Sequence, residues 1–432
     1  MADNKDKKVL KSSIEREQNQ TCLNSAEREK IKGSTNLNVP HLRFPEFRGE
    51  WEEHTLSEYL EFKNGLNPDA KRIGNGLPFI SVMDVLSEGV IRYDNIRGKV
   101  DATEKEIECF GVKNGDILFQ RSSETLEDVG RANVYMDDRT AIYGGFVIRG
   151  RKIGNYDPMF FKFLLATPLA RKSTCRMGAG AQHFNIGQEG LSKILLFFPH
   201  IEEQRKIASL LSLIDQRIAT QNKIIEDLKL LKSAIIDYAV NTLDIDTVKF
   251  SSLYKTAREG GTPSTSSVDF YKNGQIPFVK IDDLKQKYLT ENKDFITELG
   301  LQKSSAWLVP TNSILFSNGA TIGEISITTY PVCTKQGILG IVPKSHVDVE
   351  FLYYFMSSTY FRKEVCRIMT EGTMKTAYLK DINNIPCPIP TKETQQEIAK
   401  MPSLLNSKIE LEQDILDTLN KQKQYLLRQM FI

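Results

Sequence analysis

The most constraining feature of this sequence is a long segment that occurs twice. Residues 199–236 return at 390–427 at a constant offset of 191, and 11 of the 38 aligned positions are identical. A period this long exceeds the roughly 20–50 residues of solenoid repeats, so the repeated unit is a whole domain with a long helix. The same offset relates Asp157 to Asp348 and Cys175 to Cys366. We therefore expect a globular domain and a helix, followed by a second domain and a second helix.

Length and composition fit a soluble protein of several domains. The chain has 432 residues, of which 40% are apolar and 26% charged, enough for two or three ordinary cores. No apolar run approaches the roughly 18 residues of a membrane helix and no signal peptide is visible, so we expect a cytoplasmic protein without membrane contact. The predicted segments are a flexible polar tail (1–40), a first domain (41–200), a central spacer helix (201–241), a second domain (242–390) and a C-terminal spacer helix (391–432).

Short apolar runs between Gly, Asn and Asp turns predict strands in both domains. The runs fall at 78–82, 116–119 and 145–148 in the first domain and at 277–281, 313–316 and 338–342 in the second. Asp157 followed by Pro158 predicts the start of a helix over 157–172, which Pro168 should kink or end. A single helix is expected over 349–367. Each domain should mix helices and strands, so the expected fold class is α+β with an internal pseudo-twofold duplication.

The repeated segments predict two long helices with a coiled-coil seam. Apolar residues recur at alternating steps of four and three, which gives a period of about 3.5 residues. The seam residues are Ile207, Ile214, Ile218, Ile225 and Leu228 in the first helix and Ile398, Leu405, Ile409, Leu416 and Leu419 in the second. Polar seam positions also coincide, with Gln221 matching Glu412 and Lys232 matching Lys423. We expect the helices to pair antiparallel with each other; the alternative is that each lies alone on its own domain.

The second helix carries one departure from the repeat. Pro402 stands where the first helix has Leu211. Because proline costs about 3 kcal/mol inside a helix, we expect a break there, with the main piece starting near Ser403.

Motifs for catalysis are missing from the sequence. There is no Walker A motif, and Asn67-Pro68-Asp69-Ala70 lacks the aromatic residue of an adenine methyltransferase loop, so a turn is the simpler interpretation. Asp283-Leu284-Lys285 has residue types found in nucleases but no second acidic element near it. The six cysteines form no C-x-x-C pair and the five histidines are scattered, which predicts no metal site. We therefore expect a binding protein that is not an enzyme and holds no cofactor.

Several of these segments resemble the specificity subunit of Type I restriction-modification systems. The resemblance rests on Leu42-Arg43-Phe44-Pro45-Glu46-Phe47 followed by Trp51, on the strands at 77–79 and 276–278, and on the Pro-x-x-Glu-x-Gln-x-x-Ile-Ala openings at 199 and 390. It implies two target-recognition domains that each read half of a bipartite, asymmetric double-stranded DNA target. It also implies an antiparallel helical spacer that docks two methyltransferase subunits, with restriction/translocase subunits in the full complex. S-adenosylmethionine, ATP and Mg would then be bound by these partner subunits.

Loops that follow the core strands are the candidates for reading bases. Arginine pairs with guanine, Gln and Asn pair with adenine, and glycine lets the backbone approach a phosphate. The candidates are Gln120, Arg121, Ser122, Ser123, Arg131, Gly180, Gln182, His183 and Asn185 in the first domain, and Ser317, Asn318, Thr321, Gly372, Thr373, Lys375 and Thr376 in the second. The alternative interpretation of each loop is an ordinary surface turn.

A second class of function remains open at this point. The net charge is only +2, from 57 basic and 55 acidic residues, so charge alone does not indicate nucleic-acid binding. A cytosolic adaptor that assembles protein partners through its paired helices, without touching DNA, would also explain the duplication and the missing catalysis. The paired polar loops and the resemblance over the whole chain favour DNA recognition.

Overall fold

The computed structural model describes residues 38–180, 183–319, 321–369 and 375–432. It divides into two compact units, residues 1–218 with 418–432 (unit 1) and residues 219–417 (unit 2). These units cut across the five predicted segments, because each contains one globular domain together with parts of both long helices. Most of the predicted tail, residues 1–37, lies outside the described residues. None of the described helices combines the length and the apolar character that crossing a membrane requires.

Unit 1 contains two four-stranded sheets with helices packed on them. The first has the order β2 (Leu60–Asn64), β10 (Val147–Lys152), β6 (Ile117–Gln120) and β8 (Ala132–Val134), all antiparallel. The second has the order β4 (Lys99–Val100), β3 (Ile73–Ile80), β9 (Ala141–Tyr143) and β5 (Gly111–Val112). The remaining elements are β1 (Glu52–Thr55) paired with β12 (Leu195–Phe198), α3 (Val82–Val85), α4 (Glu104–Phe110), α5 (Pro158–Ala166), α6 (Pro168–Cys175) and α7 (Gln188–Ser192).

Unit 2 repeats this arrangement with one strand more in its larger sheet and one fewer in its smaller sheet. Its larger sheet runs β14 (Tyr254–Glu259), β21 (Ile338–Pro343), β18 (Ile314–Ser317), β19 (Ile325–Thr328) and β16 (Tyr288–Leu289). Its smaller sheet runs β17 (Asp294–Ile296), β15 (Ile276–Val279) and β20 (Cys333–Thr334). The others are β13 (Thr247–Lys249) paired with β22 (Pro386–Pro388), α9 (Glu298–Gln302), α10 (Val349–Ser357), α11 (Thr359–Ile368) and α12 (Leu379–Ile382). The duplication and the α+β class inferred from the sequence are confirmed.

The predicted helix break at Pro168 is present, and its counterpart in unit 2 was missed. Thr167 ends α5 and caps α6, its side chain accepting from the Ala170 amide. Ser358, 191 positions later, does the same between α10 and α11: its backbone is extended and its hydroxyl accepts from the Phe361 amide at 3.1 Å. The single helix predicted over 349–367 is therefore wrong. The first break could be predicted because Pro168 follows the capping residue. In unit 2, Thr359 follows the capping serine, so the sequence gives no comparable signal.

The repeated Pro-x-x-Glu-x-Gln opening ties each long helix to its domain. Gln204 accepts a hydrogen bond from the Asp157 amide at 3.1 Å and donates to the Pro199 carbonyl at 2.9 Å. Gln395 does the same with the Asp348 amide at 2.7 Å and the Pro390 carbonyl at 2.9 Å. Both glutamines are buried. Because the two aspartates cap α5 and α10, one amide side chain fixes the start of a long helix against the start of a domain helix in each unit.

The N-terminal segment quoted for the resemblance packs on the helix ends of unit 1. Arg43 forms an ion pair with the buried Glu203 at 2.7 Å, and the Leu42 amide donates to the Gln429 carbonyl at 2.8 Å. Trp51 is 2% exposed and makes edge contacts with Phe160 and Phe431. This segment therefore closes the core where both long helices meet the domain.

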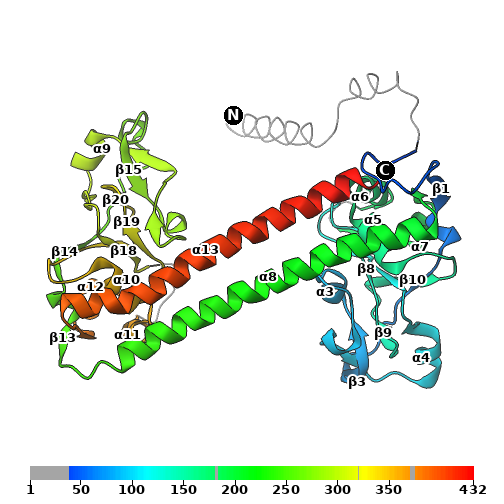
Figure 1. The fold of residues 1–432 in the computed structure, drawn as a ribbon, viewed down its shortest axis with the longest axis horizontal. Coiled ribbons are helices and arrows are strands. Elements are labelled where there is room, and N and C mark those ends of the chain that lie inside the picture. Colours follow the sequence, from blue (N-terminus) through cyan, green and yellow to red (C-terminus); the bar gives the residue numbers. More distant parts are fainter. Residues whose placement is uncertain (1–37, 181–182, 320, 370–374) are drawn as a thin grey trace, which may run out of the picture. The chain divides into compact units, whose positions relative to one another are not determined.

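The two long helices are α8 (Ile201–Asn241) and α13 (Lys392–Gln429), and they run antiparallel (Figure 1). In unit 2, Gln221 donates to the Glu412 carbonyl at 2.9 Å and also to the Glu412 carboxylate, while Lys232 Nζ donates to Asn406 Oδ1 at 2.9 Å. In unit 1, Lys423 forms an ion pair with Asp215, which is the residue 191 positions before Asn406. The polar positions of the seam thus contact the opposite helix, as paired helices require.

All ten predicted seam residues are buried or half-buried. The alternative of two helices lying separately on their domains does not fit the helix-to-helix hydrogen bonds in unit 2 and the ion pair between the helices in unit 1.

The predicted break at Pro402 is wrong, because α13 continues through it. The proline ring is buried, and the neighbouring Ser403 accepts from Lys287 Nζ at 3.1 Å and Tyr354 Oη at 3.2 Å while donating to Glu350 Oε2 at 3.1 Å. These tertiary contacts hold the helix in place although the Ile398 carbonyl lacks the amide N–H that residue 402 would otherwise donate to it.

Replacing Pro402 with alanine should stabilise the protein. The substitution restores the missing hydrogen bond to the Ile398 carbonyl and removes a residue that is about 3 kcal/mol less favourable than Ala in a helix, offset by the lost burial of the ring. We expect a gain of about 1–3 kcal/mol, measured as a higher Tm of the full chain. The matched control is Leu211→Ala at the equivalent position of α8, where the buried leucine should cost about 2–5 kcal/mol. A lower Tm for Pro402→Ala would mean that ring packing outweighs the helix defect.

Candidate nucleic-acid interface

In unit 1 the structure brings the two predicted loops together. β7 (Ser122–Ser123), which follows β6, pairs antiparallel with β11 (Phe184–Asn185), and Ser122 Oγ hydrogen-bonds to Asn185 Oδ1. The Ile186 amide donates to the Arg121 carbonyl at 3.0 Å. Residues about sixty positions apart therefore form one polar surface beyond the end of β6.

Unit 2 joins its two loops at the corresponding place. Gly319, after β18, forms an antiparallel bridge with Thr376. The Ala377 amide donates to the Asn318 carbonyl at 2.9 Å, and Asn318 Nδ2 donates to the Ala377 carbonyl at 3.2 Å. The sequence grouped these residues only as separate loops, whereas the fold makes them one site in each unit.

Three of the candidate residues are turned into the protein. Gln120, Ser317 and Asn318 are 5%, 0% and 1% exposed. Gln120 Nε2 donates to the Ser122 carbonyl at 2.9 Å, and Ser317 Oγ donates to the Thr321 carbonyl. In the folded chain these side chains hold the loops on the strand ends, and their role in reading bases stays a prediction. From the sequence, a polar residue directly after a strand is expected to be free to contact a ligand. Here the side chains of Gln120 and Ser317 instead donate hydrogen bonds to backbone carbonyls of their own loops.

The other candidates differ in how available they are. His183, Asn185, Thr321 and Lys375 are exposed, and Ser122, Ser123 and Thr376 are half-buried. Two arginines are already engaged, since Arg121 donates to the Gly145 carbonyl at 3.3 Å and Arg131 pairs with Asp128 at 2.6 Å. Gln182, Gly372 and Thr373 lie outside the described residues.

Gly180 is required by its backbone. Its φ is +147°, and a Cβ there would lie 1.9 Å from the His183 carbonyl oxygen. No larger residue could hold this close approach, so the loop that presents His183 and Asn185 depends on glycine at this position.

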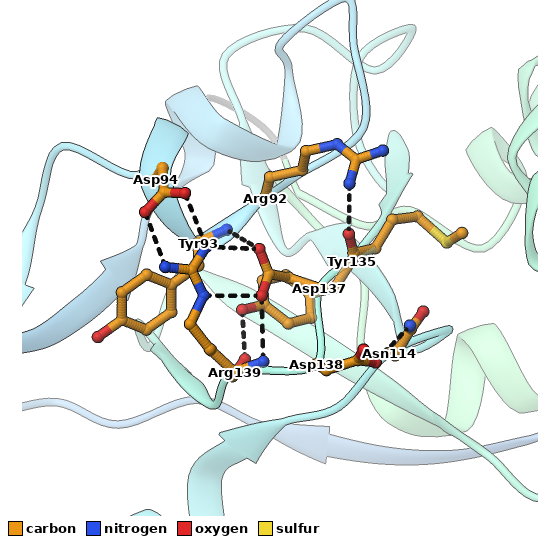
Figure 2. Close-up of polar contacts among 9 residues, drawn as sticks. Arg92, Tyr93, Asp94, Asn114, Tyr135, Asp137, Asp138 and Arg139 are labelled. Atoms are coloured by element: carbon orange, nitrogen blue, oxygen red, sulfur yellow. Dashed lines mark hydrogen bonds and ion pairs between the residues drawn. The ribbon is translucent and has the colours of Figure 1, made fainter.

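A polar cluster that the sequence did not reveal fixes a turn in unit 1 (Figure 2). Arg139 donates to both oxygens of Asp94, at 2.9 and 2.7 Å, and to Asp137 at 3.1 Å, with its guanidinium 4.3 Å from the centre of the Tyr93 ring. These hydrogen bonds lower the pKa of both aspartates. With two carboxylates on one guanidinium, the cluster clamps the Tyr93–Asn95 turn, and Arg139 is not a free phosphate-binding group. The only sequence signal was the Asp137-Asp138-Arg139 run.

Among the described residues, no group of three or more His, Cys, Asp or Glu side chains could hold a metal ion. The described cysteines are free, and Cys333 and Cys387 are buried. Burial raises the pKa of the Cys333 thiol to about 11, so it is protonated at neutral pH.

Comparison with known proteins places this chain among DNA-specificity proteins. Residues 48–230 and 243–421 each match the family described as Type I restriction modification DNA specificity domain. The type I restriction enzyme MjaX specificity subunit of Methanocaldococcus jannaschii is 24% identical over 404 residues, covering 88% of this chain and 92% of the relative. The MjaIX specificity subunit of the same organism is 30% identical over 195 residues, covering 44% of each.

Solved structures share the fold. The S subunit of a Type I restriction-modification system from M. genitalium superposes with a TM-score of 0.56 at 16% identity, covering 91% of this chain and 99% of the other. A chain from a structural study of complex assembly and conformational transition of the type I R-M system gives a TM-score of 0.58 at 14% identity, covering 90% and 98%.

Proposed function

Because the chain belongs to the Type I restriction-modification DNA specificity family, in which it is a non-catalytic recognition subunit, we propose that each unit reads one half of a bipartite, asymmetric DNA target. One observation carries the proposal: both units keep the same strand order while the joined loops at the ends of β6 and β18 differ. Arg121-Ser122-Ser123 in unit 1 corresponds in the repeat to Asn318-Gly319 in unit 2. A shared framework with unlike loops predicts two different half-sites. The adaptor alternative is not favoured, since the relatives are named specificity subunits.

Loop substitutions in one unit should change only one half-site. Replacing Arg121, His183 and Asn185 with Ala removes exposed or half-buried polar groups, among them the Asn185 Oδ1 that accepts from Ser122 Oγ, and leaves the buried Gln120 untouched. We expect relaxed or lost recognition of one half-site, at about 1–3 kcal/mol per lost bidentate base contact. The measurement is methylation by the assembled complex of a DNA library randomised at each half-site.

The matched control is the pair Thr321→Ala and Lys375→Ala in unit 2, which should affect only the other half-site. If either set loosens both half-sites equally, or neither, these loops are structural turns and the assignment of reading residues fails.

We further propose that the helix pair sets the distance between the half-sites. α8 has 41 residues, which gives about 60 Å at 1.5 Å per residue, more than the roughly 34–36 Å of one DNA turn. Base pairs between the half-sites would then go unread.

Lengthening both helices by one heptad tests this spacing role. Seven residues inserted after Gln221 and seven before Glu412 keep that pair in register and add about 10.5 Å, or about three base pairs. We expect the methylated motif to keep both half-sites and widen the gap, read by methylation sequencing. An unchanged gap with both half-sites intact would remove the spacing role.

We propose that the same helices dock two methyltransferase subunits, which bind S-adenosylmethionine, while ATP and Mg are bound by restriction/translocase subunits. Two of the identities between the repeats support the docking. Leu213 and Leu404 are 56% and 60% exposed, and Ile224 and Ile415 are 38% and 40% exposed. Residues eleven apart lie on one face of a helix, so each helix presents the same apolar pair outside the seam. A duplicated exposed apolar pair fits two copies of one partner.

Charged substitutions at these leucines should remove one partner each. Leu213→Asp or Leu404→Asp alone should reduce binding from two methyltransferase subunits to one, and the double variant should bind none, measured by light scattering after gel filtration. Burying a leucine contributes about 1.5–3 kcal/mol, and a buried unpaired carboxylate costs more. Leu230→Asp is the control. Leu230 is 69% exposed, but the equivalent position of the second repeat is Lys421, so this leucine is not part of the duplicated apolar pair. Loss of partner binding in the control equal to that in the test variants would contradict this assignment.

A further inference from the structure

A basic pocket in unit 2 borders the seam, since Lys232 belongs to both, and lies apart from the loops proposed to read bases. It has a volume of about 330 Å³ and lies between α8, α10 and α11. Its walls carry three cations and several hydroxyls, namely Lys229, Lys232, Arg362, Ser233, Ser357 and Tyr354. A pocket that concentrates cations and hydroxyl donors is suited to an anion.

The cations of this pocket lack carboxylate partners. Lys232 Nζ donates to the neutral Asn406 Oδ1 at 2.9 Å. Lys229 and Arg362 form no ion pair with any residue that the structure describes. The carboxylate of Glu410 lies near Lys232 but accepts from Asn406 Nδ2 at 2.7 Å. Burial is the main cause that lowers the pKa of Lys232, and the neighbouring Lys287 and Lys229 lower it further.

Unit 1 shows what the same place looks like when its cations are satisfied. There Asp215, which corresponds to Asn406, forms an ion pair with Lys423, which corresponds to Lys232. Arg171, which corresponds to Arg362, donates to the Glu127 and Val129 carbonyls at 2.8 and 2.6 Å.

The other two positions also differ. Lys229 is matched by the uncharged Asn420, and the half-buried Tyr353 by Lys162, which donates to the Glu88 carbonyl at 3.1 Å. Unit 2 therefore lacks the carboxylate of unit 1 while carrying the same number of cations, with Lys229 present and the counterpart of Lys162 absent.

We propose that the pocket of unit 2 binds a phosphate group. Lys229 and Lys232 supply point charges, the Arg362 guanidinium supplies a planar fork of donors that suits phosphate oxygens, and the Ser233 hydroxyl can donate to a remaining one. The Ser357 hydroxyl in the same wall already donates to the Tyr353 carbonyl at 2.7 Å. The volume accommodates a phosphate with its nearest waters, each of which needs about 30 Å³.

Restoring the carboxylate of unit 1 tests the proposal. The full-length chain is titrated with inorganic phosphate by calorimetry, with sodium chloride at the same ionic strength as reference. Asn406→Asp gives Lys232 the partner that Lys423 has, so phosphate should bind about tenfold or more weakly. The control Asn420→Asp adds the same charge to an exposed position of α13 in unit 1 and should leave the affinity unchanged. Because Asn406→Asp adds an ion pair, its Tm should not fall, which separates lost binding from unfolding.

Two results would overturn the proposal: no heat beyond that of the chloride reference, or equal phosphate affinity in the two variants. A second arm identifies the source of the phosphate. If a short DNA duplex without a target sequence displaces phosphate from the parent chain, and does so less from Asn406→Asp, the pocket takes a backbone phosphate. If the duplex and phosphate bind together, it takes a free phosphate or a small phosphorylated ligand.

Discussion

The structure depends on the contact between α8 and α13, because each unit is built on parts of both helices. The seam is mostly aliphatic, and its polar members meet one another or an opposite polar residue: Gln221 meets Glu412, Lys232 meets Asn406 and Lys423 meets Asp215. A polar pair buried in a seam is stable only when it is matched, so these positions fix the register and the antiparallel direction. Gln204 and Gln395 then fix each helix start to a domain helix. The register of the seam therefore determines, within each unit, where the domain is attached along the helices.

The two junctions between helix and domain have diverged in chemistry while keeping their geometry. In unit 1, Met159, Phe163 and Leu211 pack together in an apolar core. The residues at the same offset in unit 2 are Glu350, Tyr354 and Pro402. Lys287 and Ser403 join Glu350 and Tyr354 through hydrogen bonds and an ion pair. In the apolar junction of unit 1, a regular helix is held by the packing of its side chains. The polar junction holds its helix by directed bonds, which is why it can carry a proline.

The sequence predicted what periodicity and repetition encode. The offset of 191, the seam and the six core strands could be read because strands and heptads leave a pattern in apolar residues. The features missed depend on contacts between distant residues. Ser358 ends a helix that looked continuous, Pro402 does not end one that looked broken, and Gln120, Ser317 and Asn318 face inward. No local pattern in the sequence distinguishes a polar residue that contacts a ligand from one that closes a loop. That distinction depends on the pairing of β7 with β11 and of Gly319 with Thr376, which joins segments far apart in the sequence.

Charge explains why such a chain suits a larger complex. With 57 basic and 55 acidic residues, the chain has almost no net positive charge to offer to DNA phosphates. Affinity from counterion release grows with the number of phosphates neutralised, so we infer that partner subunits supply most of it. The loops then need to contribute only the difference in binding free energy between the correct and the incorrect bases. Separating affinity from discrimination lets the loops of one unit change without weakening binding to every sequence, and the duplicated framework lets the two half-sites change independently.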